Sequence, residues 1–284
     1  MRFLGTAAAD LLPAPLCKCP ICTEARKDPA LSRYRCSFLL DAENLIDCGP
    51  ELAAASMRFG LDLTELRNVF ITHTHSDHFC TSNAGFIKMS GTRDRAPVDL
   101  YISSEGLSRV MRTYTLMTDA GIRSDATEAV EKEYVRFHTV EIGVPFTAGG
   151  YDIVAVPTTH PVSGSETAIN YMFTKDGTKL LYACDTGIYL PEALEILKGS
   201  RVDKLVMEGT WGNRTDISLT SHLNAYAFVE QLDMFKKLDI IRDDTKIYCT
   251  HINHKHSWNH EAYQTFFDNS CRFDVTVARD GMEI

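Results

Sequence analysis

Four side chains of metal-binding types lie within six residues of one segment. Residues 73–78 (HTHSDH) directly follow residues 68–72 (NVFIT), whose β-branched and aromatic content predicts a buried strand. Side chains two residues apart on an extended chain point to the same side, so His73 and His75 can bind one ion together. A metal site is therefore expected where this strand ends.

The second half of the same segment offers two further ligands. The chain is predicted to turn into a helical stretch at residues 81–89, which brings Asp77 and His78 round toward a second ion. Imidazole nitrogens and carboxylate oxygens are usual ligands of zinc, iron and manganese. The alternative is that these polar residues only decorate a turn, but the H-x-H-x-D-H spacing favours a metal site.

The rest of the chain alternates between strand-like and helical patterns, which predicts a layered α/β fold. Further strands are predicted at residues 2–6, 37–40, 44–47, 98–102, 151–156, 169–173, 179–183, 204–207, 246–250 and 275–278. Helices are predicted at residues 51–59, 104–117, 191–197, 222–238 (with Ser221 as N-cap) and 260–267. No linker or repeat divides the chain, so one domain over residues 1–284 is expected. The polar stretch 91–144 has the weakest pattern and is interpreted as a variable, substrate-facing insertion.

Charge and composition limit the function classes. The chain has 29 basic and 38 acidic residues, a net charge of −9, which argues against a long nucleic-acid partner. No apolar run approaches the roughly 18 residues of a membrane-spanning helix. Nine cysteines, an odd number, favour a reducing compartment with thiols free for metal binding. A cytoplasmic location is the expectation.

The HTHSDH segment is the signature of the metallo-β-lactamase-fold hydrolases, and the chain resembles that superfamily along its whole length. The resemblance implies an αββα sandwich of two mixed sheets with outer helices and the metals at one edge. It also implies four ligands for each of two ions, with an Asp shared between them. The implied ligands are His73, His75, His160 and Asp185 for one ion, and Asp77, His78, Asp185 and His251 for the other.

Three thiols lie within six residues, at Cys17, Cys19 and Cys22. Three thiolates need a fourth ligand for a closed tetrahedral zinc site, and such a site is structural rather than catalytic. This Cys-rich loop, near residues 17–36, resembles one subgroup, the PhnP-type cyclic phosphodiesterases of phosphonate breakdown. In that subgroup a His just past the last catalytic His closes the site, and His254 stands at that place. The alternative is a loop of reduced, unliganded cysteines.

The same resemblance suggests two supporting residues. Asp47 resembles an early Asp of the family that supports the metal-binding segment, here residues 73–78 and called the metal loop below, through hydrogen bonds. A simple turn-forming role would explain an Asp at this position equally well. His222 follows residues 218–221 (SLTS) at a predicted helix start, where the PhnP type has a catalytic His that contacts the phosphate. An imidazolium there could protonate a leaving oxygen. The alternative is an exposed His in a capping turn.

The resemblance implies a hydrolase with two divalent ions (manganese or zinc, with iron a further option) and one structural zinc. The expected reaction is hydrolysis of a small phosphodiester, by family analogy a cyclic one, by a water activated between the ions. Asp77 would hold the attacking group and His222 would protonate the leaving oxygen. The alternatives are a tRNA 3′-end-processing-like ribonuclease, a lactone or thioester hydrolase and, less favoured, a non-catalytic carrier like PqqB. A membrane partner is not expected, and a homodimer is a further expectation from the resemblance.

Overall fold

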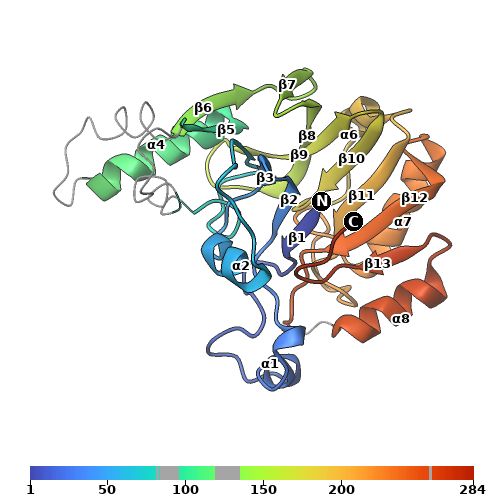
Figure 1. The fold of residues 1–284 in the computed structure, drawn as a ribbon. Helices are drawn as coiled ribbons and strands as arrows, with labels where there is room; N and C mark the ends of the chain where they lie inside the picture. The colour runs from blue at the N-terminus through green and yellow to red at the C-terminus, as the bar shows by residue number, and fades with distance from the viewer. Residues whose placement is uncertain (81–82, 84–95, 119–134, 256–257) are drawn as a thin grey trace.

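The computed structural model describes residues 1–80, 83, 96–118, 135–255 and 258–284. Two β-sheets face each other between layers of helices (Figure 1). The first sheet has six strands in the order of the sequence, antiparallel from β1 to β3 and parallel from β3 to β6. Its strands are β1 (Arg2–Gly5), β2 (Ser37–Asp41), β3 (Asn44–Ile46), β4 (Asn68–Phe70), β5 (Val98–Ser103) and β6 (Val135–Val140).

The second sheet has seven strands in the order β13-β12-β11-β10-β9-β8-β7. It is parallel from β13 to β10 and antiparallel from β10 to β7. Its strands are β7 (Phe146–Ala148), β8 (Tyr151–Pro161), β9 (Thr167–Lys175), β10 (Thr178–Ala183), β11 (Val202–Glu208), β12 (Ile241–Thr250) and β13 (Val275–Val277). Both sheets are mixed, so the predicted αββα sandwich is confirmed.

The helices cover the outer faces of the two sheets (Figure 1). Those on the first sheet are α2 (Leu52–Phe59) and α4 (Ser104–Thr118). Those on the second sheet are α6 (Pro191–Leu197), α7 (Ala225–Lys237) and α8 (His260–Ser270). The Cys-rich loop contains the short helix α1 (Pro20–Ala25) and the 3-10 turn η1 (Pro29–Leu31). Among the described helices, none is both long and apolar enough to cross a membrane.

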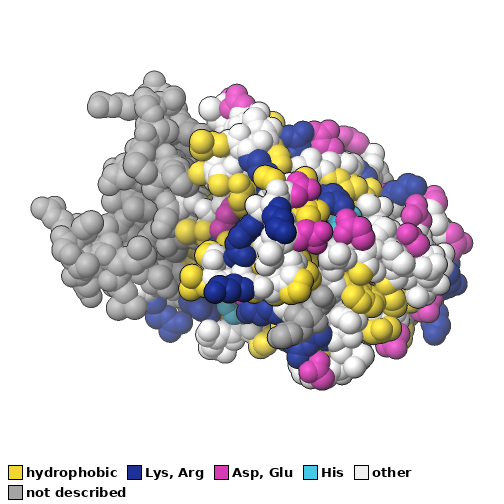
Figure 2. Space-filling model, turned by 90° about the horizontal axis from the view of Figure 1, so that it is seen from below, with side chains coloured by type: hydrophobic (Ala, Val, Ile, Leu, Met, Phe, Trp, Pro, Cys, Tyr) yellow, Lys and Arg dark blue, Asp and Glu magenta, His cyan; other side chains and the backbone are white. Residues whose placement is uncertain are grey.

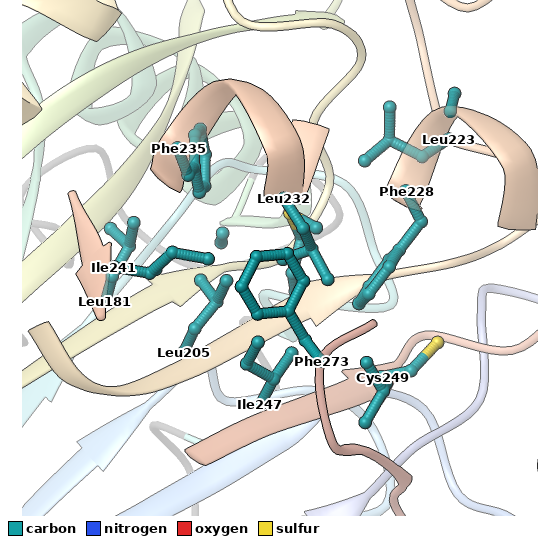
Figure 3. Close-up of a cluster of buried hydrophobic side chains, with 14 of the residues drawn as sticks. Leu181, Leu205, Leu223, Phe228, Leu232, Phe235, Ile241, Ile247, Cys249 and Phe273 are labelled. Carbon is teal, nitrogen blue, oxygen red and sulfur yellow. The ribbon is translucent and has the colours of Figure 1, made fainter. Parts of the chain in front are cut away.

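Apolar side chains hold the layers together at three interfaces. Between the sheets, Phe38 and Phe70 pack with Tyr171 and Tyr182, and all four are buried. On the outer face of the second sheet, α7 lies against the strands through residues spaced four and three apart, Phe228, Leu232 and Phe235 (Figure 3). A third cluster joins α2 and α4 to the first sheet. These clusters fix the sheets relative to each other, and with them the strand ends that carry the site.

The predicted elements hold with three corrections. The helix predicted from His222, with Ser221 as N-cap, begins at Ala225 and is capped by Asn224, whose side chain accepts a hydrogen bond from Ala227 N at 2.8 Å. The stretch 91–144 contains β5 and α4 as predicted, and it also contains β6, which was not predicted. Strand β7 and helix α1 were also not predicted. The helical stretch predicted at 81–89 lies outside the described residues, apart from residue 83.

Candidate metal centre

The site lies where parallel strands of both sheets end. Asp47 follows β3, the HTHSDH segment follows β4, Asp185 follows β10, and His251 follows β12. The carboxyl ends of parallel strands meet at the same edge of a sheet, which brings these side chains together. The strand before His160 was predicted to end at residue 156. Instead β8 continues to Pro161, so His160 lies inside it, beyond an irregularity in the pairing with β9.

One group of donor atoms combines three imidazoles with a carboxylate. The ligand atoms of His73, His75, His160 and Asp185 all lie within 4.8 Å of one another. His75 Nδ1 is 2.9 Å from His73 Nε2 and 3.1 Å from His160 Nε2. Burial and the neighbouring imidazoles lower the pKa of His73 well below its usual value, so its ring is neutral, the form that binds metals.

A second group shares Asp185 with the first. It contains His78, Asp185 and His251, with the buried Cys184 thiol beside them, again within 4.8 Å. Asp77 Oδ2 adjoins this group, 3.3 Å from His78 Nε2 and 3.8 Å from His251 Nε2. Burial alone would raise the pKa of Asp185, but the surrounding imidazoles hold that pKa well below its usual value. Asp185 is therefore an ionised carboxylate between two groups of imidazoles.

The donor atoms of the second group fit a bound cation. Nε2 of His78 and Nε2 of His251 are buried, and neither makes a hydrogen bond within the described part of the chain. They lie 3.2 and 2.8 Å from the oxygens of Asp185 without the geometry of a hydrogen bond. Such an arrangement is expected when nitrogen and oxygen lone pairs point at a shared ion rather than at each other.

Asp47 supports the metal loop. Its buried carboxylate accepts hydrogen bonds from Thr72 N at 2.8 Å and from the Thr72 hydroxyl, and its Oδ2 lies 2.7 Å from His78 Nδ1. This last contact fixes the His78 ring so that Nε2 faces the second group. Asp47 also has a φ angle of 58°, so both interpretations that the sequence left open, the supporting contacts and the turn, fit the structure.

His222 lies between the two groups, although it precedes α7 by three residues. Its ring centre is 4.7 Å from that of His160 and 5.5 Å from that of His251. His222 Nδ1 is 3.1 Å from Oε1 of Glu208, a carboxylate with no exposed surface at the end of β11. Burial disfavours the imidazolium, but the charges of Glu208 and Asp185 outweigh it and raise the pKa of His222.

Sequence reasoning missed Glu208 and Cys184. Glu208 also accepts hydrogen bonds from Thr210 N and Leu223 N, so it ties the loop that carries His222 to β11. The signal was available, because Glu208 directly follows the predicted strand 204–207 just as the implied ligands follow theirs. Cys184 is buried, and its position directly before Asp185 places its thiol among the donor atoms.

The Cys-rich loop forms a separate group of donors. Cys17, Cys19, Cys22 and His254 have ligand atoms within 4.8 Å of one another. The three Sγ atoms lie 3.9, 3.6 and 3.4 Å from His254 Nδ1, respectively. Three sulfurs and one imidazole nitrogen make the donor set of a closed structural zinc site. The loop comes from the N-terminal part of the chain and His254 follows β12, so this group ties the loop to the second sheet.

Comparisons with known proteins agree with this geometry. The model of the beta-lactamase superfamily domain matches residues 44–261. A crystal structure of a diphosphatase from the PhnP family has a TM-score of 0.72 and 20% identity, over 100% of this chain and 95% of that chain. Zinc-bound PqqB from Methylobacterium extorquens has a TM-score of 0.69 and 19% identity, over 99% of this chain and 98% of that chain.

The short form of human tRNase Z has a TM-score of 0.64 and 18% identity, over 99% of this chain and 96% of that chain. These likenesses show the fold alone, and the comparison with curated protein sequences found no match. The family model, in contrast, spans most of the chain, including the HTHSDH segment, Asp185 and His251. The chain therefore belongs to the beta-lactamase superfamily and has the metallo-β-lactamase fold.

Proposed function

We propose that the protein is a metal-dependent phosphodiesterase that hydrolyses small phosphodiesters, cyclic phosphates among them. The observation that carries the proposal is the placement of His222 between two donor groups that share Asp185, with its Nδ1 held by Glu208. This arrangement combines a place for two cations with a positioned imidazole. Phosphodiester hydrolysis needs both, because negative charge develops on the phosphoryl oxygens and on a departing alkoxide.

The proposed ligands are those implied by the resemblance to the metallo-β-lactamase-fold hydrolases. His73, His75, His160 and Asp185 would hold one divalent ion, and Asp77, His78, Asp185 and His251 would hold the other. When bound, the ions would supply Lewis-acid activation of a water and neutralise charge at the phosphoryl oxygens. His and Asp donors accept manganese, zinc and iron alike, so the donor set does not select one of them.

Asp77 and His222 supply the remaining groups. The Asp77 carboxylate lines a cavity of about 550 Å³ together with His75, so it can accept a hydrogen bond from the attacking water there. With Nδ1 of His222 directed at Glu208, the other ring nitrogen is the one that can pass a proton to the departing oxygen. Glu208 keeps the ring in that orientation, as carboxylates do for catalytic histidines.

Three of the alternatives, a thioester hydrolase, a carrier and a tRNA-processing nuclease, fit the molecule less well. A thioester releases a thiolate, which leaves without a proton donor more readily than an alkoxide does, so an oriented His222 would add little. A carrier without catalysis has no use for the Glu208–His222 pair. A tRNA-processing nuclease needs a broad basic surface, which the net charge of −9 disfavours.

The test is hydrolysis of bis-p-nitrophenyl phosphate by manganese- and zinc-loaded protein. We expect Asp77→Ala to lower the rate by about a hundredfold or more, because it removes a ligand and the acceptor for the attacking water. Circular dichroism should show an unchanged fold. Asp268→Ala, which removes an exposed carboxylate on α8, is the matched control and should retain full activity.

Unchanged turnover by Asp77→Ala would refute the mechanism. Precursor tRNA and a lactone serve as further substrates. Turnover of either that exceeds turnover of the diester would favour the corresponding alternative over a phosphodiesterase.

A further inference from the structure

Two carboxylate–threonine pairs lie behind the imidazoles of the metal centre, one pair beside each sheet. Asp47 directly follows β3, and Thr72 lies two residues after β4 in the same sheet. Glu208 ends β11 of the second sheet, and Thr210 lies two residues after it. All four residues are buried, and none exposes more than 2% of its surface. The two pairs come from different halves of the chain but make the same set of contacts.

In the first pair, Asp47 contacts one imidazole directly and a second one through Thr72. Asp47 Oδ2 lies 2.7 Å from His78 Nδ1. The Thr72 hydroxyl lies 2.9 Å from Asp47 Oδ2 and 3.1 Å from His73 Nδ1. Thr72 N also donates a hydrogen bond to Asp47 Oδ1 at 2.8 Å. The threonine is thus tied to the carboxylate at two points, and its hydroxyl stands between that carboxylate and His73.

The second pair has the same arrangement around Glu208. Glu208 Oε1 lies 3.1 Å from His222 Nδ1. The Thr210 hydroxyl contacts Glu208 Oε2 and lies 2.8 Å from His251 Nδ1. Thr210 N donates a hydrogen bond to the same carboxylate oxygen at 2.9 Å. The hydroxyl is also 3.4 Å from His222 Nδ1, but that nitrogen is nearer to Glu208.

The donors and acceptors in these contacts determine where the protons lie. A carboxylate only accepts hydrogen bonds, so the single hydroxyl proton of each threonine points to its carboxylate. The threonine oxygen then accepts a hydrogen bond from Nδ1–H of its histidine, which leaves the Nε2 lone pair free to bind a cation. Those Nε2 atoms face the metal centre, because His73 Nε2 lies 3.4 Å from Asp185 Oδ2 and His251 Nε2 lies 2.8 Å from Asp185 Oδ1.

We propose that Thr72 and Thr210 are positioning residues for metal binding, one for each ion. Thr72 fixes the proton and the ring of His73, a proposed ligand of one ion, and Thr210 does the same for His251, a proposed ligand of the other. A side chain without the hydroxyl would leave Nδ1–H buried without an acceptor, which is unfavourable and frees the ring to turn. The inference concerns metal binding and does not depend on which ester the protein hydrolyses.

The experiment is a calorimetric titration of the chelator-dialysed protein with Mn²⁺, without substrate. Manganese prefers nitrogen and oxygen ligands to thiolates, so the titration reports on the metal centre rather than on the Cys-rich loop. We expect Thr72→Val and Thr210→Val each to weaken the binding of one of the two ions by about 10- to 100-fold. The double variant should weaken both. Thr72→Ser and Thr210→Ser keep the hydroxyl and should restore the affinity to within about threefold of the wild type.

Thr245→Val is the matched control. Thr245 is a buried threonine of β12, and its hydroxyl donates to Val202 O at 2.7 Å, at the opposite end of β11 from Glu208. This variant should bind both ions as the wild type does. Circular dichroism checks the fold, and Thr72→Ala or Thr210→Ala, which also lack the hydroxyl, replace a valine variant that does not fold.

The outcomes separate this inference from the proposed function. Wild-type affinity for both ions in the two valine variants would overturn the inference. An equal loss in the serine variants would also overturn it, because the methyl group and not the hydroxyl would then matter. Equal weakening of both ions in each single variant would contradict one threonine for each ion. A wild type that binds no manganese would overturn the inference together with the metal centre. A wild type that binds two ions but does not hydrolyse bis-p-nitrophenyl phosphate would count against the proposed phosphodiesterase alone.

Discussion

Three residues of the metal centre have a left-handed backbone conformation, with positive φ, that residues other than glycine seldom adopt. Asp47, Asp185 and His251 have φ angles of 58°, 54° and 57°. Each follows a strand, and the left-handed turn at that point directs the side chain into the site instead of continuing the strand. Such conformations cost about 1–3 kcal/mol each and persist where the surrounding structure holds them, commonly at functional sites. Sequence patterns indicate which residues end the strands, and they suggested a turn only at Asp47, so the geometry that the three residues share could not be predicted.

At the same scale, His222 and Glu208 give a test of proton donation. We expect His222→Ala to lower kcat by about a hundredfold or more for a diester with an alkyl leaving group, and by less than about tenfold for a p-nitrophenyl ester. The difference arises because nitrophenolate departs without a proton, whereas an alkoxide needs one. Glu208→Gln should change both rates in the same sense but less, since the ring loses its charged partner and keeps its place. Rates across a leaving-group series provide the measurement.

His138→Ala is the matched control, because His138 is exposed on β6 and pairs with Asp99 outside the metal centre. It should leave both rates unchanged. Equal losses by His222→Ala for good and poor leaving groups would contradict proton donation and assign His222 to substrate binding or to folding.

At the scale of elements, the strand ends were the most predictable part of the site. The apolar runs before His73, Asp185 and His251 identify the strands, and the polar residue after each run identifies the edge. The helix α7 was predicted too long, because His222 and Leu223 have helix-like neighbours but are held by Glu208 instead. Strand β6 was missed because its exposed and buried residues do not alternate, as is common for a strand at the edge of a sheet. Long-range contacts, which sequence periodicity does not report, decided both cases.

The Cys-rich loop is the element whose stability depends most on a metal. Cys19 is the N-cap of α1, and its Sγ accepts a hydrogen bond from Cys22 N. We propose that Cys17, Cys19, Cys22 and His254 hold a structural zinc, and we expect Cys19→Ser to remove about one zinc per chain. Serine is itself a good N-cap, so the helix start is preserved and the loss isolates the ligand. Metal analysis and thermal unfolding should show the zinc loss with a Tm lower by about 5–10 °C.

The control for that prediction is Cys271→Ser, a thiol at the end of α8 that lies outside the four-residue group. It should retain the zinc and change Tm little. Full zinc content and an unchanged Tm in Cys19→Ser would show that the loop is held by its own packing, as reduced and unliganded thiols.

At the scale of the whole molecule, surface charge bears on the substrate. On the described part of the face shown in Figure 2, Lys and Arg side chains are interspersed with Asp and Glu side chains, so the described residues there form no continuous basic surface. A long polyanion would need such a surface, because its affinity comes from many phosphate contacts. A small phosphodiester needs only local charge, which cations held by the proposed ligands would supply at the strand ends. The net charge therefore favours the small substrate of the proposed function over a long polyanion.

The buried carboxyl group of Asp280, near the C-terminus, holds the C-terminal segment against the N-terminal part of the chain. Asp280 Oδ1 accepts a hydrogen bond from the Thr6 hydroxyl and Oδ2 accepts one from Tyr34 N, both at 2.6 Å, and Arg58 of α2 lies 3.6 Å away. The side chain is only 1% exposed. These contacts join the C-terminal segment to the first sheet, and the two termini lie close together (Figure 1). Burial raises the pKa of Asp280 to about 6.

This pKa makes the stability of the whole chain depend on pH in a known direction. The unfolded carboxyl ionises near pH 4, so between about pH 4 and pH 6 the folded chain keeps a proton that the unfolded chain has released. The stabilisation is complete below about pH 4 and is lost as the pH rises through about 6.

Relative to Asp280→Asn, which cannot titrate, the wild type should lose about 3 kcal/mol of unfolding free energy from pH 4 to pH 7. Urea unfolding of both proteins across this range measures the difference, and the metal ligands, which titrate in both, cancel from it. Only the slope of stability against pH counts, because replacing a carboxyl oxygen by an amide group also changes the hydrogen bonds of this buried side chain independently of pH. The same substitution at the exposed Asp274 controls for charge, and parallel stability curves for the wild type and Asp280→Asn would show that Asp280 keeps an ordinary pKa despite its burial.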